Sequence, residues 1–469
     1  MTEKKFPWSI GPLPVNRGKR PSLFRVIGIT GVFITKKTRS GTKSFYPGIT
    51  PGSQSGHAGN RMIKKISATN LTLGMVVTQL DRSWLDTPFF FHKVLIKSPQ
   101  QLSQLRAYCR YVYIDTEKGK DTDHSLPMKE VDPGMLQQIL EKKGPTVSPS
   151  FSDQVPSAEE FTIAREVHHQ AKQVVDQILE DARLGKSIDS LGAKEAVENI
   201  VDSVIRNRDA LVCLAQIKNK DEYTALHSLH VSILSVAFGR GLSLPREALQ
   251  ILGIGGLLHD IGKMKIPLEI LNKPARLTDG EFHQIKNHVR YGTEILGRIP
   301  HFSPKGVQMV GQHHERYGGH GYLKGLRGEQ LSLFGQIATI VDVYDAITSD
   351  RVYRRGVLPH EAVKRMFEWS PRDFDRSLIE NFIKCFGIYP VGSLVEINQS
   401  EVGLVVAANR EKALQPNVLL LKKGGENYLP ARMVQLSEKD PSTQQDLWKI
   451  TNVLDPIQEG VSIKPYLLA

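Results

Sequence analysis

The chain has 469 residues, of which 40% are hydrophobic and 23% charged, a composition typical of a globular protein with more than one domain. No uninterrupted apolar segment approaches the roughly 20 residues that span a bilayer. Its three cysteines are far apart and form no CxxC pair, which argues against a disulfide framework or a zinc ribbon. These features predict a cytoplasmic protein without a membrane span.

The net charge of +12 is concentrated in the first 61 residues. This segment holds eleven of the 61 Lys and Arg residues and one of the 49 acidic residues, which leaves 50 basic and 48 acidic side chains elsewhere. Nucleic-acid binding by the folded part is therefore disfavoured. Residues 1–61 lack a helical or strand period, which predicts a basic, disordered tail. Translation from Met62, which would remove this tail, is an open alternative.

Residues 62–116 predict a small mixed α/β accessory domain. Runs rich in β-branched and aromatic residues at 71–78, 89–96 and 111–115 indicate strands, and residues 100–108 indicate a short helix. This part has no cluster of catalytic residue types, so a regulatory or packing role is expected. Residues 117–157 are polar and predict a linker.

The remaining chain predicts a helical domain followed by a small sheet. Apolar residues recur at three- and four-residue intervals through residues 158–386, as expected of amphipathic helices. Short β-like runs at residues 393–398, 403–408 and 417–422, separated by turns, predict a C-terminal β subdomain at residues 387–469. The expected fold is therefore mainly α, with a small mixed N-terminal domain and a small C-terminal β subdomain.

The helical domain contains an unusual set of His and Asp residues. His259-Asp260 ends an apolar helical run and is followed by Gly262 and Lys263. The candidate metal ligands are His227, His259, Asp260, His288, His313, His314 and Asp342. Imidazole and carboxylate ligands without thiolate suit Fe, Mn, Zn or Co. This set exceeds the needs of one tetrahedral ion, but it suits two ions about 3.5–4 Å apart that share a carboxylate. Such a pair polarises a phosphoryl oxygen and lowers the pKa of a bound water, which is the chemistry of phosphodiester hydrolysis.

These segments resemble the HD-GYP domains, a branch of the HD phosphohydrolase superfamily. The matching stretches, in family order, are Tyr223-Thr-x-x-His-Ser, His259-Asp-Ile-Gly-Lys-x-x-Ile-Pro, Leu271-Asn-Lys-Pro, His288 with Gly292, His313-His-Glu, Gly319–Leu326, and Asp342-x-x-Asp-Ala with Arg351-x-Tyr-Arg354. The resemblance implies hydrolysis of the second messenger cyclic di-GMP to linear pGpG or GMP. It also implies that residues 62–116 are the small domain often found ahead of such domains.

The resemblance also implies a role for each site residue. His227, His259 and Asp342 would hold one ion, His288, His313 and His314 the other, and Asp260 would bridge the two. Lys263 would contact a substrate phosphate and protonate the leaving oxygen, while Tyr322, Arg351 and Arg354 would contact the dinucleotide. Some family members hold a third ion with a Glu at the position of Tyr223, so two divalent ions, iron or manganese, are expected here.

One departure and two alternatives stand beside this interpretation. The Gly-Tyr-Pro of the family is Gly321-Tyr322-Leu323 here, and because proline fixes φ, Leu323 predicts altered substrate handling with intact metal ligands. The alternatives are a protein that binds cyclic di-GMP or partner proteins without hydrolysis, and an HD hydrolase of another nucleotide. GGDEF-type or other signalling proteins are candidate partners. The remaining histidines of the domain, His230, His283, His301 and His320, are expected to be ordinary core or surface residues. Glu315 is expected either to orient a ligand histidine or to be solvated, and the sequence leaves both roles open.

Overall fold

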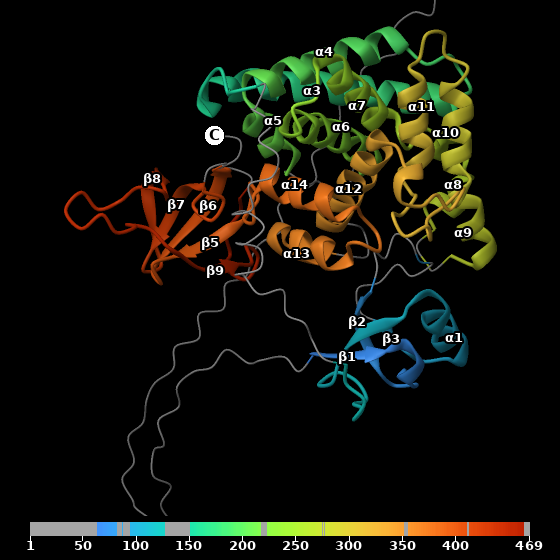
Figure 1. The fold of residues 1–469 in the computed structure, drawn as a ribbon, viewed down its shortest axis with the longest axis horizontal. Coiled ribbons are helices and arrows are strands. Elements are labelled where there is room, and N and C mark those ends of the chain that lie inside the picture. The colour runs from blue at the N-terminus through green and yellow to red at the C-terminus, as the bar shows by residue number, and fades with distance from the viewer. Residues whose placement is uncertain are drawn as a thin grey trace, which may run out of the picture. The chain divides into compact units, whose positions relative to one another are not determined.

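The computed structural model describes residues 63–81, 87, 94–126, 151–216, 223–273, 275, 277–350, 355–409 and 412–463. They belong to one compact unit, Asn60–Ala469. They form a small N-terminal sheet, a helical domain and a C-terminal sheet (Figure 1). This confirms the expected mainly helical fold, whereas the predicted domain boundaries stay predictions. The tail expected at residues 1–61 lies outside the described residues.

The N-terminal sheet has the strand order β1-β4-β2-β3, and neighbouring strands are antiparallel. Its elements are β1 (Ile63–Ser67), β2 (Val76–Leu80), β3 (Val94–Leu95), α1 (Pro99–Tyr108) and β4 (Tyr111–Asp115). The strand expected at residues 71–78 begins only at Val76, because the chain turns at Gly74, whose φ is +89°. Helix α1 starts with a capping box in which Ser98 and Gln101 each accept the other's backbone N–H.

The helical domain is built around α6, which is buried along nearly its whole length. The helices of its described part are α3 (Ser157–Arg183), α4 (Ser190–Arg206), α5 (Arg208–Ala215), α6 (Tyr223–Gly241), α7 (Arg246–Leu258), α8 (Leu268–Leu271), α9 (Asp279–Lys286), α10 (His288–Leu296), α11 (Pro304–Gln312), α12 (Leu333–Thr348), α13 (Pro359–Trp369) and α14 (Arg376–Phe386). Helix α6 contacts α3, α4, α5, α7, α12 and α14, and an apolar helix enclosed in this way is typical of a domain core (Figure 1). No helix in the described part combines the length and the apolar character that crossing a bilayer requires.

Glycines let the central helices approach closely. A Cβ on Gly256 of α7 would lie 2.8 Å from the Cα of Ser232 on α6, so a side chain there would force the two helices apart. Gly262 lies in the short 3-10 segment Ile261–Lys265 that follows α7, and a Cβ there would lie 1.9 Å from the carbonyl oxygen of His288. The glycine of the His-Asp-Ile-Gly-Lys stretch is therefore the residue that lets α10 lie against this segment.

The C-terminal sheet has the strand order β8-β7-β6-β5-β9 and is antiparallel throughout. Its strands are β5 (Leu394–Ile397), β6 (Glu401–Ala407), β7 (Asn417–Lys423), β8 (Glu426–Gln435) and β9 (Ile450–Leu454). Two apolar clusters lie in this subdomain, and one of them, which contains Leu394 and Leu404, also includes Cys213 of α5. That cluster packs the sheet against the helical domain.

We predict that Gly262→Ala destabilises the protein by ~1–3 kcal/mol, because the new methyl group meets backbone atoms of His288 and Gly292 that cannot rotate away. The measurement is a thermal melt followed by circular dichroism. Gly280→Ala is the matched control, since a Cβ there has nothing within 4 Å and Gly280 lies inside helix α9. Equal melting temperatures for the two variants would contradict the close approach at Gly262.

Candidate metal centre

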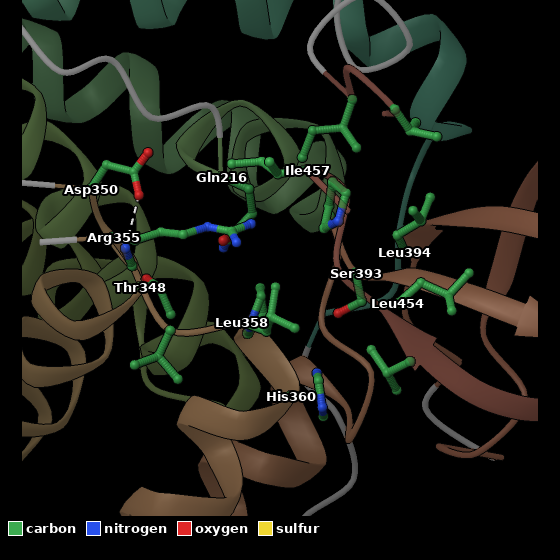
Figure 2. Close-up of a pocket in the computed structure, with 18 residues that line it drawn as sticks. Gln216, Thr348, Asp350, Arg355, Leu358, His360, Ser393, Leu394, Leu454 and Ile457 are labelled. Carbon is green, nitrogen blue, oxygen red and sulfur yellow. Dashed lines mark hydrogen bonds between the residues drawn. The ribbon is translucent and has the colours of Figure 1, made fainter. Parts of the chain in front are cut away.

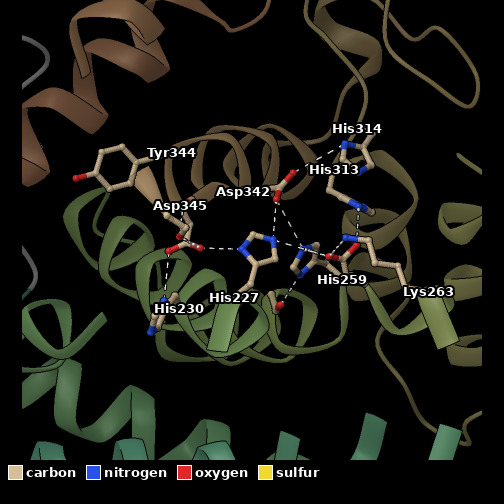
Figure 3. Close-up of polar contacts among 12 residues, drawn as sticks. His227, His230, His259, Lys263, His313, His314, Asp342, Tyr344 and Asp345 are labelled. Carbon is tan, nitrogen blue, oxygen red and sulfur yellow. Dashed lines mark hydrogen bonds and ion pairs between the residues drawn. The ribbon is translucent and has the colours of Figure 1, made fainter. Parts of the chain in front are cut away.

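Seven buried His and Asp side chains from five segments meet inside the helical domain (Figure 3). His227 lies on α6, His259 and Asp260 follow α7, His288 opens α10, His313 and His314 follow α11, and Asp342 lies on α12. They form a first cluster of His227, His259 and Asp342 and a second cluster of Asp260, His288, His313 and His314. Within each cluster the candidate ligand atoms lie within 4.8 Å of one another. The fold thus brings together all the metal ligands expected from the sequence.

The backbone sets the tautomer of three of these histidines. The Nδ1 atoms of His259, His288 and His313 lie 2.8, 2.6 and 2.7 Å from the carbonyl oxygens of Gly256, Ile285 and Val310. Because a carbonyl oxygen only accepts, each Nδ1 carries a proton, which leaves Nε2 as the nitrogen available to a metal ion. The Nε2 atoms of His288 and His313 lie 3.3 Å apart. Two imidazole nitrogens at that distance are close enough to bind the same cation.

Asp260 lies between the two clusters. Its Oδ2 is 3.2 Å from Nε2 of His259 and 3.8 Å from Nε2 of His227, both in the first cluster. Its Oδ1 is 3.3 Å from Nε2 of His288 and 3.8 Å from Nε2 of His313, both in the second. A carboxylate whose two oxygens face separate groups of nitrogen atoms has the arrangement of a ligand shared by two ions.

The carboxylates of the site are ionised despite their burial. Burial raises the pKa of Asp260, but His259 and Lys263 beside it outweigh this effect and hold the pKa well below its usual range. The pKa of Asp342 also lies below its usual range, because nearby imidazoles outweigh its burial. Burial and neighbouring imidazoles lower the pKa of His313 to about 3, so its ring is neutral at pH 7. Anionic carboxylates beside the neutral ring of His313 form an environment that attracts cations.

Unpaired buried atoms provide a test of whether metal ions fit this site. Among the described residues, His259 Nε2, Asp260 Oδ1, His314 Nδ1 and Asp342 Oδ2 are buried without a hydrogen-bond partner. An unsatisfied buried polar atom is unfavourable by ~1–3 kcal/mol. Each of these atoms is a ligand type that divalent transition metals accept, and each belongs to one of the two clusters. The two clusters therefore fit a binuclear metal site.

Asp345 holds the ring of His227 in position, a role that the sequence alone did not reveal. It is fully buried on α12, and its Oδ2 accepts the Nδ1–H of His227 at 2.7 Å (Figure 3). This bond directs the Nε2 lone pair of His227 toward the first cluster. Oδ1 of Asp345 lies 3.4 Å from Nδ1 of His230, so His230 is a buried neighbour of the site. The three-residue spacing in Asp342-x-x-Asp was the available signal.

Glu315 holds the glycine-rich loop, residues 318–328, over the second cluster. This buried carboxylate accepts the backbone N–H groups of Lys324 and Leu326 at 2.6 and 3.1 Å. A Cβ on Gly321 would lie 2.4 Å from the Cα of Glu315, so the loop can pack there only through glycine. The sequence left open whether Glu315 orients a ligand histidine or is solvated, and it does neither, because it binds loop amides.

Of the four residues expected to contact substrate, the structure describes Lys263 and Tyr322. Lys263 Nζ donates to Oδ2 of Asp260 at 2.5 Å, and the Lys263 side chain is 22% exposed. The Tyr322 ring stacks on His314 with centroids 4.7 Å apart, and Leu323 beside it is 43% exposed. The Tyr322–Leu323 peptide is cis. Arg351, Arg354 and the side chain at position 223, where some relatives carry a third-ion ligand, lie outside the described residues.

Two parts of the chain match known protein families. Residues 63–192 match a domain of unknown function (DUF3391), and residues 204–378 match the HD domain. The chain is 40% identical to the cyclic di-GMP phosphodiesterase PA4108 of Pseudomonas aeruginosa, over 86% of this chain and 97% of that protein. The chain belongs to the HD-GYP family. The resemblance noted in the sequence is thereby confirmed.

Two further relatives of this HD-GYP protein are similar over shorter stretches. The 3′3′-cGAMP-specific phosphodiesterase 3 of Vibrio cholerae is 30% identical over 42% of this chain and 44% of that protein. The cyclic di-GMP phosphodiesterase response regulator RpfG of Xanthomonas campestris is 33% identical over 38% of this chain and 48% of that protein. The family thus includes members named for different cyclic dinucleotides.

We predict that Asp345→Asn lowers metal affinity about 10- to 100-fold, because an amide orients His227 less firmly than a carboxylate does. The measurement is metal content after dialysis against limiting free metal. Asp373→Asn is the matched control, since Asp373 is a buried carboxylate that binds a histidine outside the clusters, His320, at 2.8 Å. Undiminished metal content in Asp345→Asn would contradict this role.

Proposed function

We propose that this HD-GYP protein is a metal-dependent phosphodiesterase that hydrolyses cyclic di-GMP to pGpG, GMP or both. The observation that carries the proposal is the position of the Asp260 carboxylate, which presents one oxygen to each of two buried ligand clusters. The similarity to PA4108 along most of both chains favours cyclic di-GMP over other cyclic dinucleotides.

We assign the ligands by cluster. His227, His259 and Asp342 would hold one ion, and His288, His313 and His314 the other, with Asp260 shared between them. Two divalent ions, when bound, supply Lewis acidity toward a phosphodiester and a water of lowered pKa. Iron or manganese is our proposal for their identity, because both accept imidazole and carboxylate together.

Lys263 is the proposed cation for the substrate phosphate and the proton donor for the leaving oxygen. Its Nζ lies beside Asp260, and its partial exposure leaves it within reach of a molecule entering from solvent. An ammonium there attracts a phosphate oxygen, and its proton can pass from Nζ to the departing 3′-oxygen. Loss of the charge should therefore slow turnover without removing metal ligands.

Tyr322 is the proposed stacking surface for a base. Its ring already lies on His314, and Lys286 Nζ is 5.2 Å from the ring centroid, which adds positive charge near a bound dinucleotide. Leu323, where the family has proline, lies on the exposed side of the loop and is not a candidate ligand. We therefore attribute to Leu323 an effect on substrate handling. Contacts from Arg351 and Arg354, GGDEF-type partners and a cytoplasmic location stay predictions.

We predict that Asp260→Ala abolishes hydrolysis of cyclic di-GMP while the helical circular dichroism signal is retained. Lys263→Gln should lower kcat by about 10²- to 10³-fold and keep the bound metal, because the lysine acts on the substrate. Lys265→Gln, which changes an exposed lysine two positions away, is the matched control and should have unchanged kcat. The measurement is chromatography of products from metal-loaded protein.

The outcomes separate this proposal from the alternatives. Full activity in Asp260→Ala would end the assignment of a binuclear hydrolase. Wild-type protein that binds cyclic di-GMP but releases no pGpG or GMP would identify a non-hydrolysing signalling protein. Faster turnover of 3′3′-cGAMP than of cyclic di-GMP in the same assay would keep hydrolysis and change the substrate.

A further inference from the structure

A cavity of about 270 Å³ lies between the end of α12 and the C-terminal sheet. Its lining includes Thr348, Leu358, His360, Ser393, Leu394 and Leu454, and we call it the C-terminal cavity (Figure 2). It is separate from the metal centre, because no residue of the two clusters lines it. This volume is close to the lower end of the range for ligand pockets, ~300 Å³, so the cavity suits a small organic molecule.

The wall of the C-terminal cavity is largely apolar. Leu358 precedes α13, Leu394 opens β5 and Leu454 ends β9, and their side chains approach the space from separate elements (Figure 2). Val461 and Ile463 add apolar surface from the segment after β9. Water against such a wall has few hydrogen-bond partners, so an apolar molecule that replaces it gains free energy.

Two polar atoms in this lining are buried without a partner among the described residues, Ser393 Oγ and His360 Nδ1. Ser393 is only 2% exposed, and Figure 2 shows its oxygen directed to the side where Leu358 and His360 lie. An unpaired buried polar atom is unfavourable by ~1–3 kcal/mol. A ligand hydroxyl, which both donates and accepts, satisfies either atom.

The charged groups of the lining already have partners. The Arg355 guanidinium pairs with both carboxylate oxygens of Asp455, and Oδ1 of Asp350 accepts the N–H of Gly356 at 2.8 Å. Burial lowers the pKa of His360, so its ring is neutral at pH 7. Among the described lining residues, the Arg355 cation is therefore paired with a carboxylate, whereas Asp350 keeps its negative charge, so the lining disfavours an anionic ligand.

We infer that the C-terminal cavity is a binding site for a small, uncharged, largely apolar molecule that carries a hydroxyl group, such as a phenol. The apolar body fills the space between Leu358, Leu394 and Leu454, and the hydroxyl pairs with Ser393 Oγ. This site lies outside the machinery of phosphodiester hydrolysis, so its occupancy is measured without reference to turnover.

Titration calorimetry of full-length, metal-loaded protein with phenol tests the inference. We expect saturable binding of phenol. Toluene, which lacks the hydroxyl, and benzoate, which is charged, should each bind at least about tenfold more weakly, a difference of ~1.4 kcal/mol. Ser393→Ala should reduce the affinity for phenol to that for toluene. Ser235→Ala is the matched control. Ser235 lies on α6, away from the cavity, and its buried hydroxyl likewise has no partner among the described residues, so its loss should leave phenol binding unchanged.

A second variant keeps the inference testable if Ser393→Ala does not fold. Leu358→Trp places a larger side chain in the C-terminal cavity and should abolish phenol binding while the helical circular dichroism signal is retained. The inference is overturned if phenol shows no saturable binding up to about 50 mM. That concentration detects binding free energies as small as ~2 kcal/mol in magnitude. It is also overturned by benzoate binding as tightly as phenol, or by unchanged phenol binding in both Ser393→Ala and Leu358→Trp.

Discussion

The metal centre depends on two buried carboxylates that face the Nε2 atoms of the surrounding histidines. Asp260 and Asp342 stay ionised in the interior, and the backbone keeps the protons of His259, His288 and His313 on the nitrogen turned away from the clusters. Burying an ion without full compensation is unfavourable by several kcal/mol. Lys263 compensates part of the charge near Asp260, and metal ions held by the two clusters would compensate the rest. Metal binding therefore adds to the stability of the helices that carry these ligands.

Close backbone packing determines where those ligands lie. Gly256 lets α7 lie against α6, Gly262 lets α10 lie against the segment after α7, and Gly321 lets the glycine-rich loop lie on Glu315. Each of these contacts fixes the position of at least one histidine or of Tyr322, because the ligand is a near neighbour in sequence of the packed backbone. A side chain at any of the three positions would push the packed backbone segments apart. Interiors packed at native density cannot absorb such a displacement without strain.

The sequence was sufficient for the residues whose chemical type alone suggests their role. Adjacent His and Asp residues at the end of an apolar helix suggested metal ligands, and their order along the chain suggested the family. Asp345 was harder to interpret, because a carboxylate can bind a metal, orient a histidine or form an ion pair, and only its 2.7 Å contact with His227 decides among these roles. Glu315 was ambiguous for the same reason, since its partners are backbone amides, which every residue except proline carries.

The C-terminal sheet was predicted only where pairing is local. Strands β5, β6 and β7 follow one another and were expected, whereas β8 was missed although Gly424-Gly425 before it, both with positive φ, is a hairpin signal. Strand β9 pairs with β5 through Leu454 and Leu394 across a long stretch of chain. Local residue patterns do not report such a pairing, because its register is determined by the packing of the whole sheet. The C-terminal cavity, which both strands line, was for that reason invisible in the sequence.

Helix α12 reaches both the metal centre and the C-terminal cavity. Thr348 in its last turn lines the cavity, and its hydroxyl donates to the carbonyl oxygens of Tyr344 and Asp345 at 2.8 and 3.2 Å. Ser349 donates to the Asp345 carboxylate itself at 3.3 Å. These hydroxyl groups connect the last turn of α12 to Asp345, the residue that orients His227. Coupling between two binding sites is reciprocal. If a molecule in the C-terminal cavity changes the affinity for metal through this turn, metal loading must change the affinity for that molecule by the same factor.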